Sequence, residues 1–417
     1  MAATLNWGET FKVLLDVGFV ANGFTLDRSE LNGVEVLDGS TDFVDITEYV
    51  QAININRGRS SQLDSFSPGT LTVVADDRAA ERRFDPINTA SPWYQGDLGI
   101  APRRPIEIYG GSAGTTPLYK GYVYDLNIEY DEPNLSTATI FAVDALAQLG
   151  QTNLNAFTPS SQLTSDRITA ILDRPEVAWS TALRSISTGI ATCGTVPYED
   201  QTNVLQALQA VQFAENGRLF ADRNGNVNFD QRIIDTFATA VADLGGTAIT
   251  SIPITALSTI YGAETVLNRV AVQISGGTAS SIANGTASQA EYGIKNFSLT
   301  DIPLVNDAAG SALAASLLDF YQNPEVRFDE VNILVNPLSD SQTETMAALE
   351  IGDVLTVTKT FATGSPSTVM KDVVIEGIQH VVTPSRHDIR LRLGHITVLL
   401  PFVLDTSGLD DATYALY

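Results

Sequence analysis

The chain has 417 residues, of which 44% are hydrophobic, a formal net charge of −25 and a pI near 4.3. Single cores stop growing at roughly 250–300 residues, so two to four domains are expected, and the ordinary apolar content excludes a disordered chain. The acidic charge excludes a broad basic surface that would hold nucleic acid by its phosphates.

The first 150 residues have the composition of a β-domain. The run STATIFAV at 136–143 alternates Thr, Thr and Phe with Ala, Ile and Ala, as in a strand with one covered face. The glycines between 110 and 114 predict a hairpin tip. We expect a barrel or sandwich domain over 1–150, with strands at Phe43–Ile55, Gly69–Ala75, Arg103–Tyr109, Leu118–Tyr130 and Ser136–Val143.

Between about 151 and 240 the pattern indicates helices and a hairpin. One helix is predicted over Ser165–Asp173, with a stop at Pro175. A second begins after Asn203, which can cap it, and ends at Asn216-Gly217. Asn224-Gly225 then lies between two alternating strands, which is a strong hairpin signal. We expect a small α+β domain over 151–240.

From about 241 the chain returns to strands. The stretch Ser275–Ser288 is rich in Gly, Ser, Ala and Thr, and predicts a mobile loop. A helix over Asp307–Tyr321 is expected to end before Pro324 and to bury Ala312, Leu313, Leu317, Phe320 and Tyr321. We expect a second β-domain over 241–400 and an extended arm over 401–417, with strands at Arg269–Ile274, Glu330–Val335, Val354–Thr358, Val373–Val382 and Asp388–Leu393. The whole pattern predicts a mainly β fold of the α+β class.

Export and membrane signals are not evident. The N-terminus, MAATLNWGETFKVLLDVGFV, has early acidic residues and no basic segment before a long apolar core, unlike a signal peptide. The apolar run Ile396–Leu404 is far too short to span a bilayer and contains Pro401. We therefore expect folding in the cytoplasm and no membrane insertion by this chain.

Candidate metal ligands do not form a motif. His380, His387 and His395 fall in one predicted strand-turn-strand unit with no known ligand spacing, so hydrogen-bonded or surface histidines are expected. The run Asp222 to Asn228 resembles the start of a calcium loop. Val227 and Ile233, however, occupy the positions where Gly and a bidentate Glu are needed, so the hairpin is the preferred interpretation.

Catalytic patterns are also missing from the sequence. Cys193 is the only cysteine, has no neighbouring base, and is expected to be a small buried residue that forms no intrachain disulfide. No histidine accompanies a G-x-S-x-G motif, and Ser275–Gly285 lacks a phosphate-loop pattern. We predict no catalytic, cofactor-binding or metal site, and no enzyme activity. Trp93 and Tyr94 are the most exposed-looking aromatic pair, which keeps a carbohydrate-binding surface open beside ordinary packing.

Several short motifs follow one another in order. The N-terminal ones are Val44–Val50, the basic turn in Ile53–Arg59, Phe66–Val73, Phe84–Asn88, Pro92–Tyr94, Leu118–Val123 and Phe141–Leu146. The later ones are Glu291–Gly293, the helix ending in Tyr321–Pro324, Ile351–Leu355 and Val374–Ile378. Over most of the chain, this order resembles the siphophage minor tail protein and tail hub family, especially that of actinobacteriophages.

The resemblance implies a structural virion protein at the phage tail tip, assembled in the bacterial host cytoplasm. Related hubs form a trimeric ring in which each chain has two barrel-like domains that mimic tail tube subunits, so three chains present six domains to a sixfold tube. The implied partners are distal tail and tail tube proteins, the tape measure protein, and other minor tail or receptor-binding proteins. The loop 275–288 and the arm 401–417 are candidates for those contacts.

Genomic DNA is implied to pass through the ring without specific binding, and an acidic channel wall would suit that passage. Two alternatives stay open. A peripheral tail adhesin that binds carbohydrate would depend on Trp93 or Tyr94. A secreted glycoside hydrolase would need an export signal and paired carboxylates.

Overall fold

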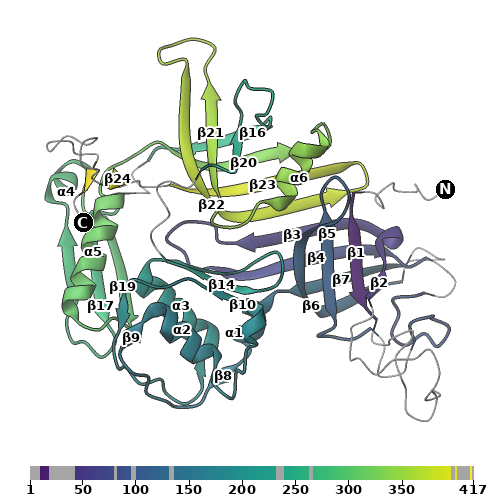
Figure 1. Ribbon diagram of the computed structural model, residues 1–417, viewed down its shortest axis with the longest axis horizontal. Coiled ribbons are helices and arrows are strands. Elements are labelled where there is room, and N and C mark those ends of the chain that lie inside the picture. Colours follow the sequence, from purple (N-terminus) through teal and green to yellow (C-terminus); the bar gives the residue numbers. More distant parts are fainter. Residues whose placement is uncertain are drawn as a thin grey trace.

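The computed structural model describes residues 10–17, 43–78, 82–94, 100–130, 136–231, 239–262 and 266–395, and the backbone of 400–401 and 414–415. It confirms a mainly β fold, with large antiparallel sheets and few helices (Figure 1). Most of the predicted arm 401–417 lies outside the described residues. No helix in the described ranges is long and apolar enough to cross a membrane.

The first portion forms seven antiparallel strands in the order β3-β4-β7-β6-β5-β1-β2. Their core faces alternate with solvent faces, as the period of two requires. The predicted strand Phe43–Ile55 is divided in two, because the Asp45 carboxylate accepts a hydrogen bond from the Thr47 backbone N–H at 3.0 Å and turns the chain. The strands are β1 (Lys12–Asp16), β2 (Phe43–Asp45), β3 (Val50–Gly58), β4 (Ser67–Asp76), β5 (Pro105–Gly110), β6 (Thr116–Glu129) and β7 (Thr137–Val143).

The middle portion contains the predicted helices α2 (Thr164–Leu172) and α3 (Val204–Glu215), and a short α1 (Ala145–Gly150). Asn203 caps α3 by accepting from the Gln206 N–H, and Asn216 ends it in the left-handed conformation. The predicted hairpin is confirmed as β13 (Arg218–Ala221) and β14 (Val227–Asp230). Short pairings complete this portion: β8 (Asn153–Leu154), β9 (Gln162–Leu163), β10 (Arg184–Ile186), β11 (Thr192–Cys193) and β12 (Thr202–Asn203).

The last portion adds six strands to the sheet of the first. The predicted strands there are confirmed, and the longest, β22, reaches further toward the N-terminus than expected. The helix α6 (Asp340–Ala348), which has a capping box at its N-cap residue Ser339, was not predicted. The strands are β15 (Ala242–Leu244), β16 (Ala256–Ile260), β20 (Arg327–Leu334), β21 (Val354–Thr360), β22 (Thr368–Thr383) and β23 (Arg386–His395).

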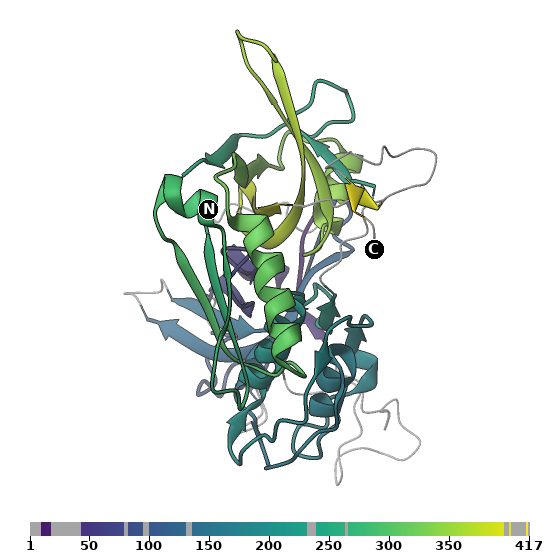
Figure 2. The same cartoon turned by 90° about the vertical axis from the view of Figure 1, so that its left-hand side faces the viewer.

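A separate sheet, β18-β17-β19, packs against helix α5 (Asp307–Tyr321) and forms its own small core (Figure 2). Its strands are β17 (Arg269–Ile274), β18 (Ser281–Asn284) and β19 (Asn296–Ile302). The helix range is confirmed, but two of its predicted core positions are wrong: Ala312 is exposed and Phe320 only half-buried, while Ala314 and Leu318 are buried.

The prediction of a loop over 275–288 is wrong for its second half. Residues 281–284 form β18, and helix α4 (Thr286–Tyr292) begins directly after it. The buried side chain of Asn268 holds the end of this segment: its amide donates to Ser288 Oγ at 3.2 Å and, beyond the segment, to the Gly293 carbonyl at 2.7 Å. Backbone pairing and a buried amide therefore order a segment whose small side chains offer little to pack.

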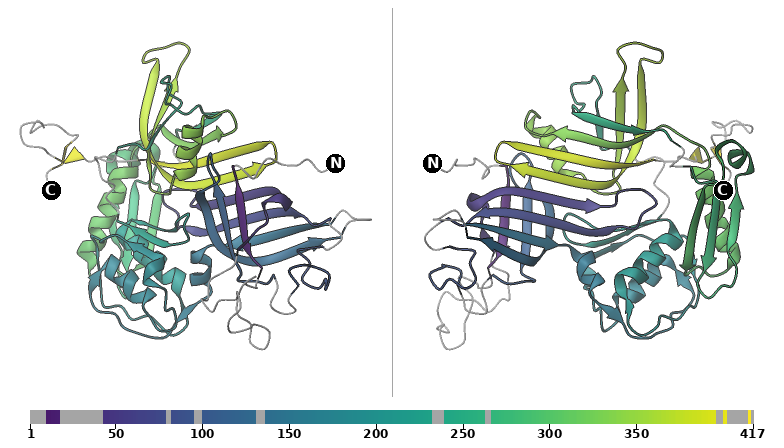
Figure 3. Two further views of the ribbon diagram at one scale, coloured as in Figure 1. Left: turned by 45° about the vertical axis from the view of Figure 1, so that its right-hand side comes forward. Right: turned by 180° about the vertical axis from the view of Figure 1, so that it is seen from behind.

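The first and last portions meet in one thirteen-stranded sheet, because β3 pairs with β22 (Figure 3). The buried residues around this sheet fall into two cores. One consists mostly of residues of the first portion, with Ala347 and Val382 from the last, and the other joins the middle helices to the last portion and includes Phe66. We call the β3–β22 pairing, residues 53–58 against 377–382, the seam.

Candidate functional site: the seam of the shared sheet

The backbones at the seam approach each other at two glycines. Gly58 pairs with Gly377 and has a φ of +97°. A Cβ at Gly58 would lie 2.3 Å from the Glu376 carbonyl oxygen and 2.5 Å from Gly377 Cα. Both the left-handed backbone and the lack of space require glycine here.

Glu376 is buried beside this contact, and its carboxylate accepts hydrogen bonds from two arginines. Its Oε2 accepts from Arg59 Nε at 2.7 Å, and its Oε1 from Arg218 Nη2 at 3.3 Å. The Arg59 backbone N–H also donates to the Glu376 carbonyl at 2.9 Å. One carboxylate of β22 thereby connects Arg59, the residue after β3, and Arg218 in β13, which belong to the first and middle portions of the chain.

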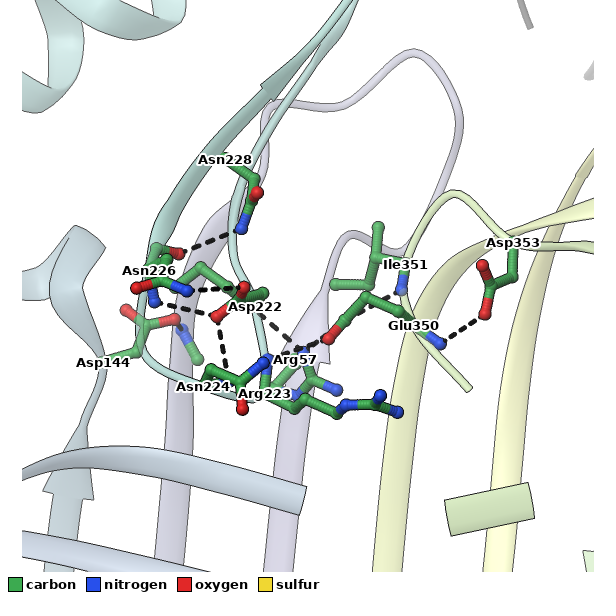
Figure 4. Close-up of polar contacts among 12 residues, drawn as sticks. Arg57, Asp144, Asp222, Arg223, Asn224, Asn226, Asn228, Glu350, Ile351 and Asp353 are labelled. Carbon is green, nitrogen blue, oxygen red and sulfur yellow. Dashed lines mark hydrogen bonds and ion pairs between the residues drawn. The ribbon is translucent and has the colours of Figure 1, made fainter. Parts of the chain in front are cut away.

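Glu350, in the turn before β21, repeats this arrangement (Figure 4). Its carboxylate accepts from Arg57 Nη1 at 2.6 Å, from the Arg223 backbone N–H at 2.8 Å and from the Ile351 N–H at 2.9 Å. Arg57 comes from β3 and Arg223 from the β13–β14 turn. We call Arg57, Arg59, Arg218, Glu350 and Glu376 the seam cluster.

The β13–β14 turn that reaches Glu350 is held by Asp222 (Figure 4). Its carboxylate accepts from the N–H of Asn224 at 2.9 Å and of Asn226 at 2.8 Å, and Gly225 takes a φ of +82°. These bonds use the Asp222 carboxylate, which a calcium-binding loop would need as a ligand, within the turn itself. The hairpin interpretation of residues 222–228 is therefore confirmed.

Asp144, near Arg57, is the most strongly perturbed carboxyl of this region. Burial raises its pKa to about 7, against the lowering effect of the backbone N–H groups of Gly69, Leu146 and Ala147. The Gly69 N–H donates to Asp144 Oδ2 at 2.6 Å. A perturbed carboxyl can mark a catalytic acid, but this one is enclosed and engaged as the cap of α1, which gives it a structural role.

The seam cluster can position chain segments, and its charges are engaged with one another. Removing one partner of a buried ion pair typically costs about 3–5 kcal/mol, because the other charge is left uncompensated. The cluster therefore joins three portions of the chain, and its charged groups are paired with one another instead of serving as a free acid or base.

Solved structures show where this architecture occurs. A tail protein from Neisseria meningitidis MC58 aligns with 93% of this chain and 96% of its own, at a TM-score of 0.58 and 10% identity. The 43 kDa tail protein of prophage MuSo2 from Shewanella oneidensis aligns over 93% and 97%, at a TM-score of 0.53 and 12% identity. The chain has the fold of phage tail proteins. No protein-family model and no curated protein sequence matches it.

Within this tail-protein fold, the aromatic pair chosen from the sequence is not a surface platform. Trp93 is only 7% exposed, and its ring packs edge-on against Phe84 at 5.1 Å and Tyr49 at 6.2 Å. Tyr94 is 38% exposed. The expectation of an exposed pair is wrong for Trp93, because its ring completes the core of the first portion.

The three histidines do not converge. His380 Nδ1 lies 3.1 Å from His387 Nε2 in the interior, whereas His395 contacts Glu325 at 2.9 Å. Burial lowers the pKa of His387 to about 4 and that of His380 well below its usual value. Among the described residues, no group of three His, Cys, Asp or Glu side chains is placed to hold a metal.

Cys193 is buried as expected, and burial raises the pKa of its thiol to about 11. Sequence reasoning found the motifs containing Arg57-Gly58-Arg59 and Glu376-Gly377 but did not predict that they pair. The signal that could have connected them is complementary: two arginines flank one glycine, and a glutamate precedes the other.

Proposed function

We propose that this chain is a structural subunit of a bacteriophage tail tip, a hub that assembles as a trimeric ring and is not an enzyme. The observation that carries the proposal is the shared sheet, in which one chain presents two β-rich portions edge to edge across the seam. Three chains would present six such portions to a sixfold tube. The fold of two phage tail proteins supports this assignment.

The ring would join the sixfold tail tube to threefold tip proteins. Its proposed neighbours are distal tail and tube proteins, the tape measure protein and receptor-binding or other minor tail proteins. Domain boundaries near residues 150, 240 and 400, and the siphophage, actinobacteriophage type, belong to the same proposal. Such a subunit would act in the virion after assembly in the host cytoplasm.

Genomic DNA would pass through the ring without being held, which agrees with a net charge of −25. The outer face of the shared sheet, formed near the seam by β20, β22, β23 and β3, has no excess of acidic side chains. Its charged side chains are two acidic and three basic ones: Glu330, Asp388, Arg386, Arg390 and Arg392. Uncharged polar side chains lie between them: Asn54, Asn56, Gln379 and Asn332. The acidic wall in this proposal is therefore formed by another face.

Light scattering of the purified chain, followed by negative-stain imaging, tests the ring. A mass three times the 44.7 kDa of one chain and a ring with an open centre are expected. A chain that stays monomeric, both alone and on isolated tails, would contradict the hub and favour a peripheral adhesin. Retention of duplex DNA at low salt would contradict the acidic wall.

A further inference from the structure

Strands β21 and β22 form a ribbon that extends beyond the rest of the molecule (Figures 1 and 2). They pair from Val354 with Val374 to Thr360 with Thr368, and the Phe361 N–H then donates to the Ser367 carbonyl at 2.8 Å. Residues 359–370 are exposed apart from the half-buried Val369. We call residues 359–370 the ribbon tip.

One face of the ribbon begins in the core and continues into the tip. Directly opposed residues of an antiparallel pair share a face, and positions two apart along a strand do so as well. Leu355 opposite Val373 is buried, Lys359 lies opposite Val369, and Phe361 follows on the same face with 46% of its surface exposed. Met370, on the other face, is 64% exposed.

Neither edge of the ribbon tip is paired among the described residues. Strand β15 pairs with β21 only as far as Val357, and β23 pairs with β22 only from Val373 onward. An isolated two-stranded ribbon is marginally stable in water, and open edges with apolar side chains are surfaces that proteins usually cover. With its open edges and exposed apolar side chains, the ribbon tip has the features of an element that docks on a partner.

The charge of the ribbon indicates the partner. Residues 359–371 contain Lys359 and Lys371, two of the five lysines in the chain, and no acidic residue, whereas the whole chain carries −25. Lys371 is engaged by Glu325 at 3.0 Å, and Lys359 is exposed at the base of the tip. Lys359 is thus the one of these two lysines without an acidic partner in the described residues, and at a net charge of −25 the surface of a second copy of this chain is acidic on average and complementary to it.

We propose that the ribbon tip docks on a neighbouring copy of this chain, with Phe361 and Met370 in the contact and Lys359 against acidic side chains. This inference rests on the proposed ring, since the ring places copies side by side. It assigns the subunit contact to the last portion of the chain.

A photo-cross-linking experiment tests the contact. Cys193 is buried with a raised thiol pKa, so a Thr363→Cys substitution supplies the reactive site for a benzophenone maleimide. Thr300→Cys, exposed on β19 away from the ribbon, is the matched control. We expect cross-linked dimers and trimers of the chain from position 363 and none from position 300.

A shortened ribbon provides the second measurement. Replacing Thr360–Thr368 with Asn-Gly joins Lys359 to Val369 by a two-residue turn that keeps the register of the base. At concentrations too low for assembly the variant should unfold at the wild-type temperature, and at concentrations where the wild type is a trimer it should stay monomeric in light scattering. A trimer that persists without cross-links at position 363, or cross-links only to a different protein, overturns the inference and leaves the hub standing. A wild-type chain without trimer or cross-links, both alone and on isolated tails, overturns both.

Discussion

The two ends of β22 differ in how far the rest of the chain covers them. Residues 377–382 pair on both sides, with β3 and β23, and lie beside a buried ion-pair cluster and a glycine contact. Residues 368–370 belong to a ribbon with open edges and exposed apolar side chains. The first end is fully paired within the chain, whereas the second end leaves backbone edges and apolar side chains open to contact with a second molecule. Mutations should therefore affect folding at the first end and association at the second.

The largest effect is expected for Glu376→Gln. The variant leaves Arg59 and Arg218 buried without a counter-charge, so the free energy of unfolding should fall by about 4 kcal/mol. Glu330→Gln, which breaks the more exposed pair with Arg390, is the matched control and should cost less than about 1 kcal/mol. Denaturant unfolding measures both. Equal losses would show that the seam cluster contributes no more than a surface pair.

Gly58→Ala should destabilise the chain by about 3 kcal/mol. The new Cβ would meet the backbone of Glu376 and Gly377 and would also occupy a left-handed conformation. Gly276→Ala separates the two causes, because Gly276 has a φ of +73° and no atom within 4 Å of its added Cβ. That control should lose only about 1 kcal/mol in the same denaturation assay. Similar losses in the two variants would remove the role of close approach at the seam.

Acid should weaken the fold through the buried histidines of β22 and β23. The pKa of His387 is about 4 in the folded chain, so the unfolded chain binds protons first, near pH 6.5. Stability is present above pH 6.5 and is lost as the pH falls toward 4, by about 3 kcal/mol for this side chain. His387→Gln should remove that part of the loss in unfolding titrations at pH 7 and pH 4. Parallel pH curves for wild type and variant would contradict it.

At the open end of β22, Phe361→Ser should change the free energy of unfolding by less than about 0.5 kcal/mol at chain concentrations too low for assembly, because an exposed side chain contributes little to the monomer. Leu355→Ala, on the same face of the ribbon but buried, should cost about 2–5 kcal/mol. Thermal and denaturant unfolding of both variants locate the point where the ribbon leaves the core. A loss of several kcal/mol for Phe361→Ser would mean that the tip packs on its own chain.

Local signals were sufficient wherever a structure is made locally. Asn203 predicted a helix cap and Asn224-Gly225 a hairpin, because each acts on residues within a few positions along the chain. The seam could not be predicted this way. Arg59 and Glu376 are 317 residues apart, and no periodicity of one strand specifies which distant strand it will pair with.

The errors have the same origin. Residues 281–284 have side chains typical of a loop, but β18 is ordered by its pairing with β17, and the amide of Asn268 holds Ser288 just after it. The residues next to Trp93 in the sequence do not indicate its burial, which depends on packing against Tyr49 and Phe84. The mainly β class depended on composition and alternation alone, and it is confirmed.

The seam also determines when the molecule can finish folding. β3 is among the first strands to leave the ribosome, yet its partner β22 is synthesised more than 300 residues later. During that interval one edge of β3, with its unpaired N–H and C=O groups, stays available to other chains. Closing so long a loop makes the last step slow, and the nascent chain is most prone to misassociation just before its final strands emerge.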